Sequence, residues 1–350
     1  MGPLGQHASA APWDLGMRPL PLILFILSPF SVGIRPIIIC GRGSTLDELD
    51  LKRVVVAGGT GLVGRPLVRA LAERGIQVTV LSRNPERLNL PTGATAHGWE
   101  HLPTLLEGAD AVINLAGEGI ADRRWSAARK ALILHSRTQA TSRLVAAMGA
   151  CAHPPAALVN ASAIGYYIPK GEATVDETAA PGSGFLAEVC QAWEAEAMAA
   201  SALGVRVALV RIGVVLAREG GALPKMALPV RWFMGCKLGS GDQGLSWIHL
   251  DDLVAMLMEA ARNPAWEGVF NGTAPQPFSN EAFTRLLAER LHRPTLPVPG
   301  FLTTAATKVL LGEMAGALLL QGAYVVPARA QALGFQFRFP TAGAALENLL

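Results

Sequence analysis

Glycines in a fixed spacing carry the clearest chemical signal of this sequence. Gly58, Gly61 and Gly64 lie in AGGTGLVG, between a β-branched run and a stretch with helical periodicity. In that setting the first glycine permits a tight turn, the second lets backbone N–H groups approach a pyrophosphate, and the third lets helix and strand pack closely. The motif predicts a dinucleotide site; a glycine-rich turn without a ligand is the alternative. The residues expected at the cofactor are Gly58, Thr60, Gly61, Leu62, Val63 and Gly64.

The residues after the second expected strand indicate which dinucleotide binds. An NAD site usually has an acidic residue there, which accepts a hydrogen bond from the ribose 2′-hydroxyl. Here the sequence is Leu81-Ser82-Arg83-Asn84, without a carboxylate. Arg83 offers a planar donor fork for a 2′-phosphate, and Ser82 offers a second donor. The sequence therefore favours NADP(H) over NAD(H), although Arg83 could also be a surface arginine without a ligand.

Short β-branched runs alternate with helical stretches from Leu51 onward, which predicts an α/β fold with a doubly wound parallel sheet. Strands are expected at 53–57, 77–81, 111–115, 157–161 and 205–216. Helices are expected at 64–74, 126–148, 185–202, from about 251, and at 279–292, 301–321 and 341–350.

These elements suggest a domain plan. Residues 51–217 form a Rossmann domain, 218–247 a Gly/Pro-rich loop or lid, 248–274 a return to the Rossmann domain, and 275–350 a smaller, mostly helical C-terminal subdomain on the substrate side. Residues 1–50 are expected to be a hydrophobic N-terminal extension outside the fold.

Residues 19–40 of that extension are much more apolar than the rest of the chain. Their longest uncharged piece contains prolines and is shorter than the roughly 20 residues that cross a bilayer. Three interpretations stay open: an extension without a stable fold, a signal or anchor, and a folded element. Membrane association is expected only if residues 19–40 are retained as an anchor.

Composition excludes several classes of protein. The 350 residues include 30 Lys+Arg and 27 Asp+Glu, a formal charge of +3, and no basic block suited to a phosphate backbone, so nucleic acid is not an expected partner. The four cysteines lie far apart without metal-ligand spacing, so neither a disulfide framework nor a metal site is expected. This usage suits a reducing cytoplasm.

A set of motifs, in order, resembles one family. They are GGTGLVG (58–64), LSR (81–83), DAVINLAGEGI (110–120), ASAIGYY (161–167), FLAEVCQAWEAEA (185–197), RIGVVLAREGGAL (211–223), GSGDQGLSWIHLDDLV (239–254), FNGTAP (270–275), PVPGF, GEMAGALLLQGAYVVP and GFQFRFP. From Leu51 to Leu350 the chain resembles the atypical extended short-chain dehydrogenase/reductases called "epimerase family", sugar-nucleotide-epimerase-like or cell-division-inhibitor-like. The resemblance implies a Rossmann fold of about seven parallel strands with NADP(H) in the glycine-loop cleft.

The resemblance also implies site residues. Leu115, Ala116 and Gly117 are expected beneath the nicotinamide-side ribose and phosphate, and Ser162 is expected to face the nicotinamide. In the wider superfamily a Tyr-x-x-x-Lys helix donates the proton and holds the ribose. Aligning that helix with residues 185–202 puts Leu186 at the tyrosine position and Cys190 at the lysine position. The usual proton donor is therefore missing.

Substitutes for the missing pair lie elsewhere in the sequence. Tyr166 to Lys170 spells YxxxK, but Pro169 opposes the helical turn that would stack the two side chains. Tyr166 is a candidate for a catalytic proton carrier. Tyr167, Lys225 and His249 are candidates for the substrate pocket, although Lys225 could be a solvated loop residue and His249 a helix cap. Trp193 and Glu194 are expected to serve packing and ion pairing.

Two functional hypotheses follow. The first is an NADP(H)-dependent oxidoreductase or epimerase that acts on an unknown small polar carbonyl or alcohol compound, or on a nucleotide sugar. The second is a catalytically silent NADP(H)-binding protein with a regulatory or interaction role, which the missing Tyr and Lys favour. A membrane-associated version of the same domain is a third. Monomer and homodimer both stay open.

Overall fold

A sheet of seven parallel strands organises the computed structural model, which describes residues 50–167, 171 and 173–350. The strand order is β11-β7-β5-β4-β1-β2-β3. The strands are β1 (Arg53–Ala57), β2 (Gln77–Leu81), β3 (Ala94–His97), β4 (Ala111–Asn114), β5 (Ala157–Ala163), β7 (Arg206–Ile212) and β11 (Gly268–Gly272). The doubly wound Rossmann fold predicted from the sequence is confirmed. Strand order reverses between β1 and β4, where such sheets bind ligands.

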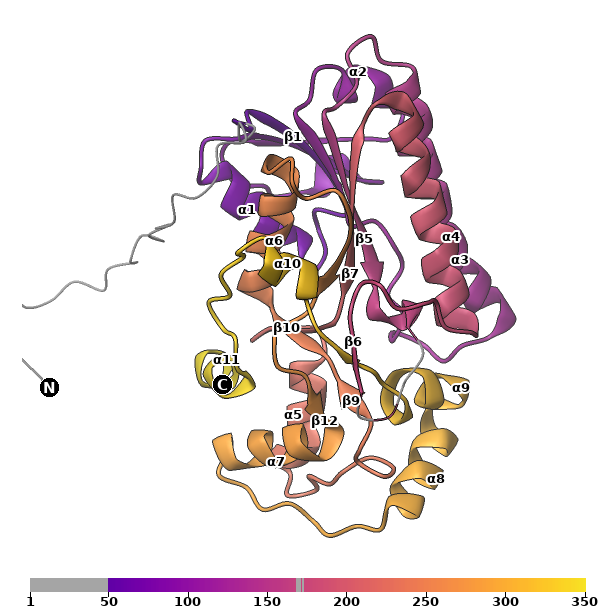
Figure 1. Ribbon diagram of the computed structural model, residues 1–350, viewed down its shortest axis with the longest axis vertical. Helices are drawn as coiled ribbons and strands as arrows, with labels where there is room; N and C mark the ends of the chain where they lie inside the picture. The colour runs from indigo at the N-terminus through magenta and orange to yellow at the C-terminus, as the bar shows by residue number, and fades with distance from the viewer. Residues whose placement is uncertain (1–49, 168–170, 172) are drawn as a thin grey trace, which may run out of the picture. The chain divides into compact units, whose positions relative to one another are not determined.

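Helices cover both faces of the sheet (Figure 1). Alternate strand residues point to opposite faces, so Val54 and Val56 join one core and Val55 joins the other. The first core includes α1 (Gly64–Ala72) and α6 (Leu250–Arg262); the second includes α2 (Leu102–Leu106), α3 (Ala127–Gly149) and α4 (Phe185–Met198). Figure 1 shows α3 and α4 lying side by side, as their contacts require. The two layers leave the carboxyl ends of the strands as the edge on which a site can form.

The strand expected at 205–216 is two strands. β7 ends at Ile212, and β8 (Val214–Leu216) pairs with β10 (Trp247–His249) outside the main sheet. The chain changes partner at Gly213, where a Cβ atom would lie 2.8 Å from the carbonyl oxygen of Ser246. The long β-branched run is thus divided at Gly213, where the chain passes too close to the backbone of Ser246 for any residue with a Cβ atom.

The C-terminal region is mostly helical, as predicted. Its elements are α7 (Asn280–Arg290), α8 (Gly300–Leu311), α9 (Glu313–Ala315), a π-helical turn (Gly316–Leu320), α10 (Ala328–Ala332) and α11 (Ala342–Leu349), with short strands β12 (Phe278–Ser279) and β13 (Tyr324–Val325), which pair with β9 (Gly244–Leu245) and β6 (Thr174–Val175). The single helix expected at 301–321 is interrupted at Gly312, whose φ is +62°. A third core forms around Trp247 and Phe283.

The segment at 218–247, expected to be a loop or lid, contains helix α5 (Leu223–Arg231). The helix was not predicted because the segment is rich in proline and glycine. Pro224 lies in the first turn of the helix, where proline is favourable. Leu223, Ala227 and Val230 bury one face of α5 in the third core.

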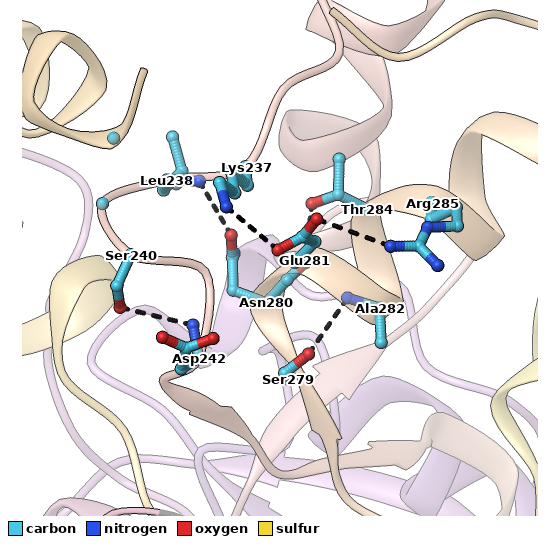
Figure 2. A network of polar contacts seen from close by, with 12 residues as sticks. Lys237, Leu238, Ser240, Asp242, Ser279, Asn280, Glu281, Ala282, Thr284 and Arg285 are labelled. Carbon is cyan, nitrogen blue, oxygen red and sulfur yellow. Dashed lines mark hydrogen bonds and ion pairs between the residues drawn. The ribbon is translucent and has the colours of Figure 1, made fainter. Parts of the chain in front are cut away.

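The second half of that segment is tied to α7 (Figure 2). The amide of Leu238 donates to Asn280 Oδ1 at 2.9 Å, and Lys237 Nζ lies 3.1 Å from Glu281 Oε2. The amide of Glu281 in turn donates to the carbonyl oxygen of Gly241 at 2.9 Å. A lid movement of residues 237–241 would have to break these bonds.

Within the described residues no helix is both long and apolar enough to cross a bilayer. The apolar stretch at 19–40 lies outside the described residues.

Candidate active site

The glycine loop joins β1 to α1 at the edge where strand order reverses. Gly58 has a φ of +80°, and a Cβ there would lie 2.7 Å from the carbonyl group of Leu115. A Cβ on Gly64 would collide with the carbonyl oxygen of Gly58. At Gly61 the nearest atom to an added Cβ is 3.5 Å away, and this residue is exposed. Gly58 and Gly64 are therefore required by the fold, whereas Gly61 leaves space on the ligand side.

The N-terminus of α1 is available to an anion. No side chain caps its first turn. Thr60 is exposed, and Leu62 and Val63 are half-buried. A Cβ on Gly221 would lie 2.8 Å from Leu62 Cδ2, so the loop before α5 reaches the glycine loop. The positive end of the helix thus lies uncapped beside a loop that is far away in sequence.

Arg83 follows β2, next to the glycine loop's strand. Its side chain is 85% exposed, and Nη2 lies 3.8 Å from Glu118 Oε1. Glu118 also pairs with Arg129 at 3.3 Å, so it does not depend on Arg83. Ser82 Oγ accepts a hydrogen bond from the amide of Asn84 at 3.1 Å. The guanidinium of Arg83 is free to turn toward a bound phosphate.

Leu115, Ala116 and Gly117 follow β4 and touch the glycine loop. The amide of Leu115 donates to the carbonyl oxygen of Ala57 at 2.9 Å. The amide of Ala116 donates to Asn114 Oδ1 at 3.1 Å, which fixes the turn out of the strand. These residues stand at the edge where the resemblance implies the nicotinamide half of the cofactor.

Ser162 lies near the end of β5 in a row of paired residues that crosses the sheet. It is paired with Arg211 of β7, and Arg211 is paired with Asn271 of β11. Ser162 is 3% exposed, and its hydroxyl donates to Glu194 Oε1 of α4 at 2.6 Å. Both oxygens of Glu194 accept from Arg211, at 2.8 and 2.7 Å. The serine is thus held by a buried bidentate ion pair.

Tyr167 belongs to the same network. Its hydroxyl donates to Asn271 Oδ1 at 2.7 Å and accepts from Arg211 Nη1 at 2.9 Å. Burial raises the pKa of Tyr167 to about 12, although its hydrogen bonds with Arg211 and Asn271 act in the opposite direction. The phenol therefore stays protonated at neutral pH, and its position favours a structural role over lining a substrate pocket.

Tyr166 is half-buried, with the Arg211 guanidinium 3.3 Å from its ring centroid. Its ring meets that of Tyr167 edge to face at 5.3 Å. Within the described part of the chain its hydroxyl has no hydrogen-bond partner. Tyr166 is thus the phenol of this group that can bond to a substrate. Pro169 and Lys170 lie outside the described residues, so the YxxxK alternative stays a prediction.

Three residues of α4 at helical spacing face the end of β5. A Cβ on Gly165 would lie 3.1 Å from Leu186 Cβ, Cys190 Sγ lies 3.5 Å from the carbonyl oxygen of Ala163, and Glu194 binds Ser162. Burial raises the pKa of Cys190 to about 11, with Glu194 adding to the effect, so it is a neutral thiol. The lysine position of the superfamily motif therefore carries no charge here.

His249 and Lys225 lie apart from this network. His249 is buried: its Nδ1 accepts from the amide of Asp251 at 3.0 Å, and its ring stacks on Phe339 at 3.9 Å. His249 Nε2 lies 3.2 Å from Asn348 Oδ1. These contacts favour a capping role. Lys225 is exposed on α5.

Sequence reasoning missed Arg211 and Asn271. The signal for Arg211 was present, because an arginine inside the apolar run VRVALVRIGVVL must find a partner when the strand is buried. Glu194 was expected to form an ion pair, and it is that partner.

Comparisons with known proteins identify the family of the chain. Residues 54–271 match the family model "NAD dependent epimerase/dehydratase family", and residues 298–349 match a domain of unknown function, DUF1731. The chain is 40% identical over 306 residues to the chloroplastic epimerase family protein SDR39U1 homolog of Arabidopsis thaliana, covering 85% of this chain and 86% of that protein. It is 38% identical over 304 residues to epimerase family protein SDR39U1 of Bos taurus, covering 85% and 99%.

A solved structure is also similar. The crystal structure of human epimerase family protein SDR39U1 (isoform 2) with NADPH has a TM-score of 0.75 and 36% identity, over 85% of this chain and 98% of that chain. The family resemblance inferred from the motifs is confirmed: the chain belongs to the NAD dependent epimerase/dehydratase family, among the SDR39U1-like epimerase family proteins.

Proposed function

We propose that the protein binds NADP(H) and acts as an oxidoreductase or epimerase on a small polar carbonyl or alcohol compound, with nucleotide sugars in the same substrate class. One observation carries the cofactor choice: an exposed arginine, Arg83, stands at the end of β2 where an NAD site has a carboxylate. The NADPH in the structure of the human relative supports the same choice.

The residues present fit this cofactor. Gly61 leaves room for a pyrophosphate at the uncapped start of α1, and Arg83 has donors for a 2′-phosphate. Leu115 to Gly117 border the other half. When bound, the nicotinamide supplies a hydride donor or acceptor.

Hydride transfer at a carbon that bears oxygen requires a proton to move as well. Tyr166 is the group we assign to that transfer, because its hydroxyl is uncommitted and its ring faces a cation. The hydroxyl of Ser162 donates its hydrogen bond to Glu194, so its oxygen is suited to accept a hydrogen bond from a substrate hydroxyl. The Arg211–Glu194 pair fixes Ser162 in that orientation.

A silent NADP(H)-binding protein is the second candidate. Leu186 and the neutral Cys190 occupy the positions of the usual Tyr and Lys, which favours it. Binding alone would then set the conformation that a partner recognises.

Calorimetric titration of the full-length protein with NADPH and NADH tests the cofactor. We expect NADPH to bind at least about tenfold tighter, a difference of roughly 1.4 kcal/mol, and Arg83→Ala to abolish that preference. Arg87→Ala is the matched control, because Arg87 is 80% exposed on the same segment. Absence of nucleotide binding, or an unchanged preference in Arg83→Ala, would contradict the assignment.

Three assays separate the two candidates: NADPH oxidation over carbonyl compounds, NADP⁺ reduction over alcohols, and chromatography of nucleotide sugars for epimerised products, since epimerisation leaves no net change in the cofactor. If the protein is an enzyme, Tyr166→Phe should lower kcat by about 10²- to 10⁴-fold while NADPH affinity stays unchanged. NADPH binding without turnover on any compound would favour the silent protein.

A further inference from the structure

Helix α8 (Gly300–Leu311) is amphipathic in the opposite sense to an ordinary surface helix. Its buried side chains are threonines, Thr303 and Thr307, whereas most of its exposed side chains are apolar. The large ones, which are 50–74% exposed, are Phe301, Leu302, Val309 and Leu310. Ala305 and Ala306 lie between them and are also exposed. A surface helix normally turns its apolar stripe toward the core, so this face requires another explanation.

The polar side of α8 is anchored to the protein, which prevents the helix from turning its apolar face inward. The amide of Gly239 donates to Thr303 Oγ1 at 3.0 Å, and a Cβ on Gly300 would collide with the carbonyl oxygen of Gly239. Near the other end of the helix, Arg124 Nη2 donates to the carbonyl oxygen of Val309 at 3.1 Å. The apolar face is therefore fixed in its exposed position.

The apolar residues of α8 follow a symmetrical order along the helix. In sequence they are Phe301-Leu302, Ala305-Ala306 and Val309-Leu310. The spacing of four residues between these pairs keeps all six side chains on one face. In either direction the order is a large pair, an alanine pair and a large pair. Such a face is complementary to an antiparallel copy of itself, because the large pairs lie at the same level and the central alanines let the two helices approach closely.

Charge and area also fit a second copy. Lys308 is the one charged residue of Gly300–Leu311, and its helical position is at the border of the apolar face. An antiparallel pair therefore brings no like charges together at its centre, whereas a lipid-binding helix carries several Lys and Arg residues beside its apolar face. Two copies joined along this face would bury about 1,000 Å² in total, the lower end of what a specific interface requires. Figure 1 shows α8 at the outer edge of the C-terminal region, where a second copy can approach.

We propose that the apolar face of α8 is the contact surface for a second copy of this chain, joined antiparallel across a two-fold axis between Ala305 and Ala306. Leu302, at the centre of the face, then packs on Val309 of the second copy, and Val309 on its Leu302. The same patch is used on both copies, so the contact closes as a dimer and does not extend into a filament. Because Arg124 of the turn after β4 holds the end of α8, the pair also braces the C-terminal region against the Rossmann domain.

Sedimentation equilibrium of the full-length protein at about 1–100 µM tests the dimer, since small interfaces dissociate in that range. Wild type should be dimeric at the upper concentrations. Val309→Glu should raise the dissociation constant at least about tenfold, because it places a carboxylate in the centre of an apolar contact. Val309 is exposed, so the variant should keep its fold, which thermal unfolding checks. Ala306→Glu replaces Val309→Glu if that variant is unfolded.

A mixture of two variants tests the antiparallel arrangement. Leu302→Lys should weaken self-association as Val309→Glu does. An equimolar mixture of the two should restore dimers, because opposite charges then meet at one of the two symmetric contacts and the other keeps its leucine and valine. Leu132→Glu is the matched control, since Leu132 is a 47% exposed leucine on α3, and it should leave the association unchanged.

Every other outcome overturns the inference. A wild type that stays monomeric over the whole range excludes the dimer. If that monomer binds vesicles of phosphatidylcholine and phosphatidylglycerol and Val309→Glu does not, α8 is a lipid-binding surface instead. A dimer that Leu132→Glu breaks and Val309→Glu keeps uses α3 in place of α8. Variants that stay monomeric when mixed exclude the antiparallel arrangement. None of these outcomes affects the proposed function, which does not depend on association.

Discussion

The glycine loop and the buried network around Arg211 lie at the same edge of the sheet but use their polar groups differently. In the glycine loop, Gly58 and Gly64 serve backbone geometry, and the first turn of α1 has no side-chain cap. In the network, Ser162, Glu194 and Tyr167 hydrogen-bond with one another or with Arg211. The first region keeps its polar groups for a ligand, and the second commits them to the fold. The glycine loop therefore suits any dinucleotide. The chemistry instead depends on the few polar groups that the network leaves without a hydrogen-bond partner in the described part of the chain, such as the hydroxyl of Tyr166.

The largest expected effect comes from breaking the network. Arg211→Met should lower the free energy of unfolding by about 3–5 kcal/mol, because it leaves the Glu194 carboxylate buried without its partner. Urea unfolding followed by tryptophan fluorescence measures this. Adding Glu194→Leu should recover part of the loss, since no unpaired charge remains. A single variant as stable as wild type would show that the pair is not needed.

A smaller effect separates the glycines of the loop. Gly64→Ala should cost about 1–3 kcal/mol of stability, because the new methyl group meets the backbone of Gly58. Gly61→Ala should stay within about 0.5 kcal/mol of wild type, since the new methyl group makes only an ordinary van der Waals contact, 3.5 Å from the carbonyl oxygen of Gly58. NADPH titration of the folded Gly61→Ala should show weaker binding. Equal stability losses at both positions would contradict the division between fold and ligand.

The smallest effect concerns pH, at a polar group outside both regions. Burial lowers the pKa of His249 from its usual 6.5, although Asp251, Asn348 and Asp252 act in the opposite direction and Arg338 adds to the lowering. Below that usual value the unfolded chain takes up a proton that the folded protein does not. Stability should therefore fall as pH falls below 6.5, by at most about 1.4 kcal/mol per pH unit from this group.

His249→Asn removes the titration and keeps an acceptor for the cap of α6. Comparing Tm between pH 7.5 and 5.5 should show a smaller loss in this variant than in wild type. The same loss in both would assign the acid sensitivity to other groups.

The sequence predicted the fold where each element carries its own signal. Strands β1, β2, β4 and β5 are β-branched runs, and α1 has marked ends. β3 was missed because its residues are half-exposed, and β11 because it contains glycine and asparagine. α5 was not predicted because it contains prolines. One lies in the first turn, where a helix tolerates proline, and Pro229 lies inside the helix, where proline bends it.

The site was predictable where backbone geometry dictates residue type. The spacing of Gly58, Gly61 and Gly64 predicts a nucleotide loop, and the structure has these residues between β1 and the start of α1. The ion pair between Arg211 and Glu194 depends on β7 lying next to β5 in the sheet and on the packing of α4. A local sequence pattern does not determine strand order, so this pair could not be predicted.

The start of α6 depends on residues much later in the chain. Asp252 is 2% exposed and accepts hydrogen bonds from the amides of Arg338 and Phe339, at 2.8 and 2.9 Å. His249 likewise contacts Asn348, 99 residues later. During synthesis these buried groups lack their partners until residues 338–348 leave the ribosome. The layer that α6 adds to the sheet is thus completed late in synthesis, and a chain cut before Arg338 should leave these buried groups without hydrogen-bond partners.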